Sequence, residues 1–149
     1  MLYRIFFVTW LLTGCASQSE PYQPGKDNKS LVGLCPASPN CVSTSTTSSI
    51  HQIDAPILAT APEQAWPAVI ATVKSLPRTI ITYQDNYHLR AESRSRLFRF
   101  IDDIEIYLDT ENNQLAMRSA SRLGYSDLGV NGRRLHALID QLRVQGIVK

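Results

Sequence analysis

The chain has 149 residues, of which 44% are apolar and 19% are charged. This composition fits one globular domain and excludes a disordered tail protein, and no internal period indicates a repeat array. The sequence has 11 Arg and four Lys against 13 Asp and Glu, so the formal net charge is only +2. So small an excess, with no basic run, gives no reason to expect nucleic-acid binding.

The first fifteen residues have the pattern of a secretion signal. One cation, Arg4, precedes an apolar run over residues 5–12, and small residues follow. The run is shorter than the roughly 20 apolar residues that a membrane-spanning helix needs. The sequence Leu12-Thr13-Gly14-Cys15 resembles the bacterial lipobox, in which cleavage leaves the Cys as the first residue, acylated on its thiol and its amine. We therefore expect a signal peptide over residues 1–14 and lipid, including palmitate, on Cys15. An ordinary signal peptide with a chance Cys and a membrane-spanning anchor are the alternatives.

The residues after Cys15 predict a location. In Gram-negative lipoproteins, Asp at the next position retains the protein in the inner membrane, so by resemblance Ala16 indicates the periplasmic face of the outer membrane. Residues 15–34 are polar and rich in turn-forming residues, which is typical of a flexible tether. We thus expect a cell-envelope protein held on its membrane by the lipid anchor, with a single domain over residues 35–149.

The mature chain keeps one pair of cysteines, Cys35 and Cys41, in an oxidising compartment. Two Pro and one Asn among the five intervening residues predict a tight loop closed by a disulfide. The alternative is a metal site, but this would need two further ligands, and the chain has no second Cys pair and only isolated His residues. We expect no metal and no cofactor.

The domain begins with a mixed pattern of one strand, one helix and two more strands. Pro62 suits the first turn of a helix, and Pro77 ends it. One face of that helix carries the apolar side chains and Thr72. The expected elements are a strand over Ile50–Thr60 with a kink at Pro56, a helix over Pro62–Leu76, a strand over Thr79–Tyr83, a turn at Asp85-Asn86 and an alternating strand over Tyr87–Glu92.

A strand over Leu97–Leu108 follows a polar turn at Ser93–Arg96. Its apolar residues share one parity and hence one face of the sheet: Phe98, Phe100, Ile104, Ile106 and Leu108. Asp102 has the same parity. We therefore expect Asp102 on the buried face, held by hydroxyl or cationic groups of residues 118–131, because an unpartnered buried carboxylate is costly. If its partner is Arg122 or Arg133, removal of one member alone would leave the other charge buried.

The partner strand spans Leu115–Leu123. The four-residue loop between the two strands sets Leu108 opposite Leu115, and the same register places Phe100 opposite Leu123. On the other face it sets Glu105 opposite Arg118 and Arg122 diagonal to Asp103.

A final helix has Leu135, Leu138, Ile139 and Leu142 on one face and Asn131 as a plausible N-cap. The order β-α-β-β-β-β-α predicts an α+β fold, with an antiparallel sheet of about five strands and two helices.

Three stretches together resemble a known family. They are Cys35–Ser43, the pattern Phe98-x-Phe100-x-Asp102-Asp103, and the long segment Arg118–Asn131. They are similar to the domain-of-unknown-function family fourteen ninety-nine, which is found in bacteria and plant plastids, and the resemblance covers roughly residues 33 to 144. The family has no established activity, so the resemblance implies a domain and no particular chemistry.

The segment between the last strand and the last helix is the most unusual. In its simplest interpretation Gly124 and Gly129 only permit the connecting turns. However, Arg133 and Arg134 lie in the first helical turn, where the helix dipole disfavours cations. With nearby backbone N–H groups they would bind an anion such as a phosphate, a carboxylate or a lipid headgroup. Pairing of these arginines with Asp127 or Asp102 would explain the same pattern without a ligand. The candidate ligand site comprises Asp102, Arg118, Ser119, Ser121, Arg122, Tyr125, Asp127, Asn131, Arg133 and Arg134.

These residues support three functions unequally, and none is assigned as catalytic. Asp102 and Asp103 point to opposite faces, so they make no acid–base pair. The leading hypothesis is a non-enzymatic envelope lipoprotein that binds a small anionic or lipidic ligand or a protein partner. The alternatives are an envelope enzyme that uses Asp102 as a base of raised pKa with Ser119, Ser121 and Arg122, and a purely structural envelope protein.

Overall fold

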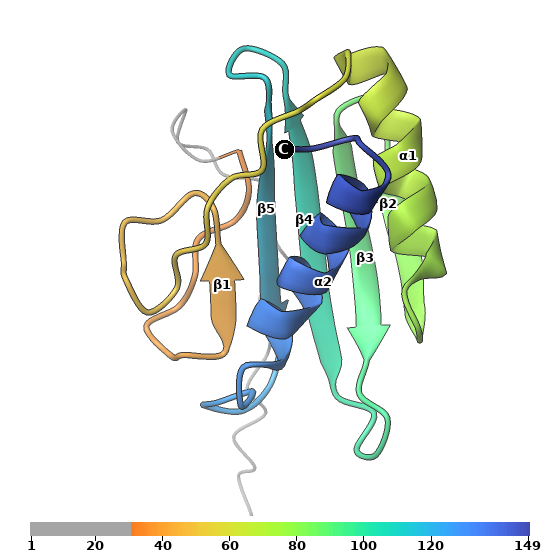
Figure 1. The fold of residues 1–149 in the computed structure, drawn as a ribbon. Coiled ribbons are helices and arrows are strands. Elements are labelled where there is room, and N and C mark those ends of the chain that lie inside the picture. The colour runs from red at the N-terminus through yellow and green to blue at the C-terminus, as the bar shows by residue number, and fades with distance from the viewer. Residues whose placement is uncertain (1–30) are drawn as a thin grey trace, which may run out of the picture.

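A computed structural model describes residues 31–149, which form one five-stranded antiparallel sheet with both helices packed on one face (Figure 1). The strands follow the order β1-β5-β4-β3-β2, so β2 to β5 form a meander and β1 adds to its far edge. This α+β arrangement confirms the predicted order. The elements are β1 (Cys41–Ser43), α1 (Pro62–Ser75), β2 (Thr79–Gln84), β3 (His88–Arg94), β4 (Ile101–Asp109), β5 (Gln114–Ser121) and α2 (Val130–Val144).

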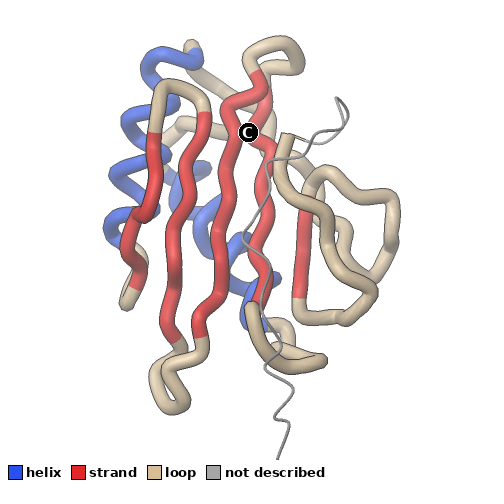
Figure 2. Tube along the Cα trace, turned by 180° about the vertical axis from the view of Figure 1, so that it is seen from behind, coloured by secondary structure: helices blue, strands red, loops and turns tan. Residues whose placement is uncertain are grey.

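The hydrophobic core lies between the sheet and the two helices, and the rear view shows the sheet without a helix in front of it (Figure 2). Pro62 begins α1 as predicted, and Pro77 follows its end because the residue before a proline is disfavoured in a helix. The predicted face of α2 is buried. Its core residues are Leu135, Leu138, Ile139 and Leu142.

The predicted register of β4 and β5 is confirmed. Leu108 pairs with Leu115, and Asp102 pairs with Ser121. The loop has the predicted length because Asp109 holds it: its carboxylate accepts hydrogen bonds from the backbone N–H and the side-chain amide of Asn112, at 3.1 and 2.8 Å.

The first strand is not where the sequence predicts it. The chain over Ile50–Thr60 makes only isolated bridges, and the strand beside β5 is Cys41–Ser43. Ile53 and Leu58 are nevertheless buried, so the apolar pattern signals contact with the core and not a strand. Pro56 has no N–H to donate, and the edge of β5 is already occupied by β1.

The predicted burial of Phe98 and Phe100 is wrong. Their exposed fractions are 70% and 49%, because β4 begins only at Ile101. The hairpin closes before that point: Ser95 N–H donates to the carbonyl of Phe100, and the N–H of Phe100 donates to Ser95 Oγ, both at 2.9 Å. Arg99 has a positive φ of 56°, which breaks the strand alternation. Leu123 is also exposed, so the expected pair of Phe100 with Leu123 does not form.

The domain starts before Cys35. Val32 is buried, and the N–H of Gly33 donates to Glu105 Oε2 at 2.8 Å, so the end of the expected tether is packed on the sheet. Cys35 and Cys41 form the predicted disulfide. The expected signal peptide and Cys15 lie outside the described residues.

A pair of substitutions tests the start of β4. Ile104→Ala should lower the free energy of unfolding by about 2–5 kcal/mol, because it leaves a cavity in the core. Phe98→Ala, in the exposed hairpin, should change it by no more than about 0.5 kcal/mol. Urea unfolding measures both. Comparable large losses would mean that Phe98 is part of the core after all.

Candidate functional site

Asp102 is buried on the helix-facing side of the sheet, as its parity predicts, and it has a cationic partner. Arg134 Nη2 donates to Asp102 Oδ2 at 2.6 Å, and only 12% and 7% of the two side chains are exposed. Neither Arg122 nor Arg133 is this partner, and the pair with Arg134 is the ligand-free pairing of a first-turn arginine with Asp102 that the sequence also allows. Arg134 lies four residues before the buried Leu138 and therefore on the same, sheet-facing side of α2. Arg133 is one residue earlier, so its side chain points about 100° away from that side.

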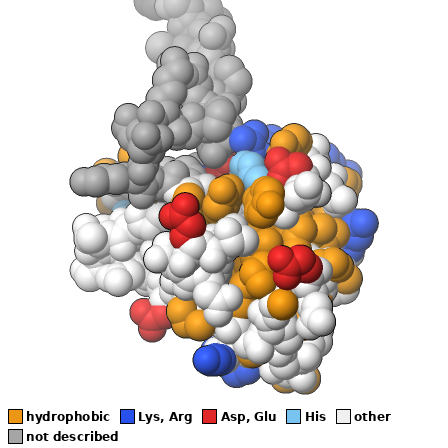
Figure 3. Space-filling view, turned by 90° about the horizontal axis from the view of Figure 1, so that it is seen from above, with side chains coloured by type: hydrophobic (Ala, Val, Ile, Leu, Met, Phe, Trp, Pro, Cys, Tyr) orange, Lys and Arg blue, Asp and Glu red, His pale blue; other side chains and the backbone are white. Residues whose placement is uncertain are grey.

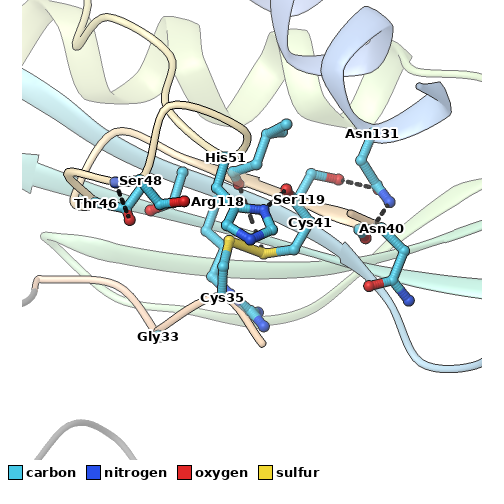
Figure 4. Close-up of a disulfide and its surroundings, with 12 residues drawn as sticks. Gly33, Cys35, Asn40, Cys41, Thr46, Ser48, His51, Arg118, Ser119 and Asn131 are labelled. Atoms are coloured by element: carbon cyan, nitrogen blue, oxygen red, sulfur yellow. Dashed lines mark hydrogen bonds between the residues drawn. A yellow bond between two sulfur atoms is a disulfide. The ribbon is translucent and has the colours of Figure 1, made fainter. Parts of the chain in front are cut away.

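The ion pair belongs to a larger hydrogen-bond network. Arg134 Nη1 donates to Ser119 Oγ at 3.0 Å and to Asn131 Oδ1 at 2.6 Å, and Ser119 Oγ donates to the same oxygen at 2.6 Å. Asn131 Nδ2 then donates to Ser121 Oγ and to the carbonyl of Asn40, both at 3.0 Å. Figure 4 shows Asn131 between Ser119 and Asn40. The network therefore joins α2 to β4, to β5 and to the disulfide-closed loop.

Asn131 is not the N-cap that the sequence predicts. The cap position is Gly129, with φ of 77°, and Asn131 is buried in the network. Asp127 supplies the capping carboxylate, which accepts the N–H of Gly129 at 2.9 Å and the N–H of Asn131 at 2.7 Å. A carboxylate at this helix end also suits the helix dipole.

Of the residues proposed for an enzyme, Asp102, Ser119 and Ser121 belong to this one network, whereas Arg122 lies apart. Ser119 is fully buried, and its hydroxyl is engaged by Asn131 and Arg134. Arg122 lies on the opposite face of the sheet, where Nη2 contacts Asp103 Oδ1 at 2.7 Å and Glu92 Oε1 at 2.6 Å. The hydrogen bond with Asp103, which sequence analysis predicts as a diagonal pair, is the main cause that raises the pKa of Arg122.

A second charged cluster lies buried on the helix-free face of the sheet, around Glu105. Glu105 is 2% exposed, and its carboxylate lies 3.6 Å from Arg90 Nε and 3.8 Å from Arg118 Nη1. His88 Nε2 is 3.9 Å away, and burial, followed by the charge of Arg90, lowers the pKa of His88. The sequence predicts that Glu105 pairs with Arg118, but it does not predict that Glu105 is buried. The burial depends on the segment with Val32 and Gly33, which packs on this face of the sheet and donates a hydrogen bond to Glu105.

Arginines gather at one end of the sheet, where β2 begins and β3 ends. One hollow of about 430 Å³ lies between this end of the sheet, the end of α1 and the start of α2. A second hollow of about 530 Å³ adjoins it. Five exposed arginines line the two hollows, and we name this group the arginine end: Arg78, Arg94, Arg96, Arg99 and Arg133. Within residues 31–149 none of the five makes an ion pair with a carboxylate.

The structure separates the residues of the anion site expected from sequence. Of the predicted arginines, Arg133 lines the 430 Å³ hollow and donates to the carbonyl of Leu128 at 2.9 Å. Arg134 also lines that hollow, but its guanidinium is paired with the carboxylate of Asp102. Tyr125 is 76% exposed and lies on the neighbouring loop surface. The spacing Arg94-x-Arg96-x-x-Arg99 is visible in the sequence, but only the pairing of Thr79 with Ser93 brings Arg78 beside it.

Residues 31–149 contain neither a metal-ligand cluster nor a membrane-spanning helix. That range holds no group of three or more His, Cys, Asp or Glu side chains suited to a metal ion. Neither α1 nor α2, the helices of that range, has the length and apolar character needed to cross a bilayer.

Comparison with known proteins gives a family. The family model described as protein of unknown function (DUF1499) matches residues 32–142, which is most of the chain, so the chain belongs to this family. Among curated proteins and among solved structures, no match to the chain is found.

Two neighbouring arginines test the network. Arg134→Met should lower the free energy of unfolding by about 3–5 kcal/mol, because it leaves the buried carboxylate of Asp102 without its cation. Arg133→Met, one position earlier and on the surface, should cost less than about 1 kcal/mol. Chemical denaturation of both variants checks the difference. Equal small losses would show that Asp102 is solvated.

Proposed function

We propose that this DUF1499 protein is a non-enzymatic, lipid-anchored domain of the cell envelope that binds an anionic ligand at its arginine end. The observation that carries the proposal is the set of five arginines that line two adjoining hollows with no carboxylate partner among residues 31–149. A guanidinium stays charged at any physiological pH and presents a planar fork of donors that matches phosphate and carboxylate groups.

The turns at the two ends of the sheet differ in charge: the β3–β4 hairpin carries Arg96 and Arg99, whereas the β2–β3 and β4–β5 turns at the other end are acidic. The opposite end carries the turns with Asp85, Asp109 and Glu111. Figure 3 looks down on that end, where hydrophobic side chains gather, separate acidic side chains lie among them, and Lys and Arg lie toward the margin. Arginines without a carboxylate partner produce a local positive potential, which raises the concentration of anions near them.

The proposed location rests on the N-terminal sequence and on the disulfide. Leu12-Thr13-Gly14-Cys15 follows an apolar run of signal-peptide length, and Ala16 favours the outer membrane by resemblance to Gram-negative lipoproteins. The disulfide between Cys35 and Cys41 is typical of an exported protein. The envelope-enzyme alternative has less support, since Asp102 is paired with Arg134, the Ser119 hydroxyl is engaged by Asn131 and Arg134, and Arg122 lies on the opposite face of the sheet.

Titration with pyrophosphate tests the proposed binding site. In the full chain, pyrophosphate should shift the amide NMR signals of residues 78–79 and 93–99, and added salt should weaken the effect. Arg94→Gln/Arg96→Gln should weaken binding by roughly tenfold or more, because each removes a charge-assisted contact. The control is Arg143→Gln, an exposed arginine of α2 that contacts Asp140. Binding that survives the double substitution, or that Arg143→Gln reduces equally, contradicts the proposal.

Replacement of Cys15 tests the anchor. Cys15→Ser should abolish incorporation of radioactive palmitate and prevent lipoprotein processing, because no thiol is left to be acylated. Cys41→Ser is the matched control: it removes a thiol, and it should retain the label if the protein accumulates. Palmitate labelling of Cys15→Ser at the level of the unsubstituted chain would refute the lipobox interpretation.

A further inference from the structure

We propose that the arginine end is a membrane-docking surface that binds the phosphate groups of anionic phospholipids while two apolar loops enter the interfacial layer. The inference rests on the proposed anion site and names its ligand class. Two loops carry the apolar contribution: the β3–β4 hairpin over residues 95–100 and the β5–α2 connection over residues 122–129. We name as the apolar rim their six large exposed side chains: Leu97, Phe98, Phe100, Leu123, Tyr125 and Leu128.

The two loops leave the same end of the sheet. Asp102 near the start of β4 pairs with Ser121 at the end of β5, and the N–H of Arg122 donates to the carbonyl of Ile101 at 3.1 Å. In Figure 1 both loops project beyond the lower ends of the strands, next to the start of α2. The apolar rim is thus a property of one end of the domain and not a set of scattered side chains.

Hydrogen bonds within each loop hold the apolar side chains outward. Ser95 closes the hairpin on Phe100, and the rings of Phe98 and Phe100 stack with centroids 5.6 Å apart. In the other loop Ser126 Oγ accepts the N–H of Leu128 at 3.2 Å, and Asp127 accepts that of Gly129. The conformation that these hydrogen bonds hold leaves the Leu128 side chain 84% exposed. Six large exposed apolar side chains at one end of a domain indicate an interaction surface.

Cations alternate with the apolar side chains of the rim. Arg96 and Arg99 flank Leu97 and Phe98 in the hairpin, and Arg133 reaches the carbonyl of Leu128. A surface that combines apolar side chains with several arginines matches an anionic bilayer, where apolar groups enter the acyl boundary and cations contact phosphates. A free phosphate would use the arginines and leave the apolar rim in water.

The expected tether gives this surface access to a membrane. Fifteen residues lie between Cys15 and Leu31, and an extended chain reaches about 3.3–3.6 Å per residue, so the tether spans at most about 50 Å. That reach exceeds the diameter of a small domain, about 30 Å. The bilayer that holds the lipid of Cys15 is therefore within reach of the arginine end whichever way the domain turns.

An indole placed in the hairpin reports contact with lipid. The full chain with Phe98→Trp is reconstituted into vesicles whose acyl chains are brominated, with and without phosphatidylglycerol in phosphatidylcholine. Bromine should quench the introduced indole in the vesicles that contain phosphatidylglycerol, and Arg96→Gln/Arg99→Gln should remove most of this quenching. Val144→Trp is the control, because Val144 is exposed at the other end of α2 and should not contact lipid. The processed chain without the substitution supplies the background of Trp66, since Trp10 lies in the expected signal peptide.

A parallel titration with glycerol phosphate separates the two proposals. Equal quenching without phosphatidylglycerol, or equal quenching of Val144→Trp, would overturn membrane docking by the arginine end. Shifts of Arg94 and Arg96 by glycerol phosphate without any quenching of Phe98→Trp would overturn docking and leave the anion site intact. Absence of both effects would overturn docking together with the proposed function.

Discussion

The ion pair of Arg134 with Asp102 determines where the start of α2 lies on the sheet. An arginine in the first turns of a helix is disfavoured by the helix dipole, and a carboxylate among core residues is disfavoured by desolvation. The carboxylate compensates the unfavourable position of the guanidinium, and the guanidinium compensates the desolvation of the carboxylate. This holds only while α2 keeps the guanidinium within hydrogen-bond distance of Asp102 on β4. Ser119 and Asn131 then accept from Nη1 of the same guanidinium, so a displaced helix would leave several buried polar groups unpaired at once.

This constraint shapes the surface of the domain. Since the network fixes both the end of β5 and the start of α2, the residues between them have to loop outward, and they carry Leu123, Tyr125 and Leu128 with them. The segment that supports the family resemblance therefore has two roles. Its serines and Asn131 join the secondary-structure elements, whereas its tip extends the surface beside Arg133.

Local rules predicted what local geometry determines. The four-residue loop held by Asp109 set the whole β4–β5 register, and helical spacing identified the buried face of α2. Other features depend on contacts that no local pattern encodes. Phe98 has the parity of a core residue but belongs to a hairpin closed by Ser95, and Arg78 joins the arginine end only through the pairing of β2 with β3. Arg134 lies one helical turn before Leu138 and so belongs to the predicted buried face, but only the packing of α2 on the sheet brings it to Asp102.

The coupling between Asp102 and Arg134 tests the central claim most directly. A double-mutant cycle with Asp102→Asn and Arg134→Met, followed by urea unfolding, is expected to give a coupling energy of about 2–3 kcal/mol, because the pair is buried. The same cycle on the more exposed pair of Asp103 with Arg122, using Asp103→Asn and Arg122→Met, should give no more than about 1 kcal/mol. A near-zero coupling for Asp102 and Arg134, or one no larger than that of the exposed pair, would contradict the account.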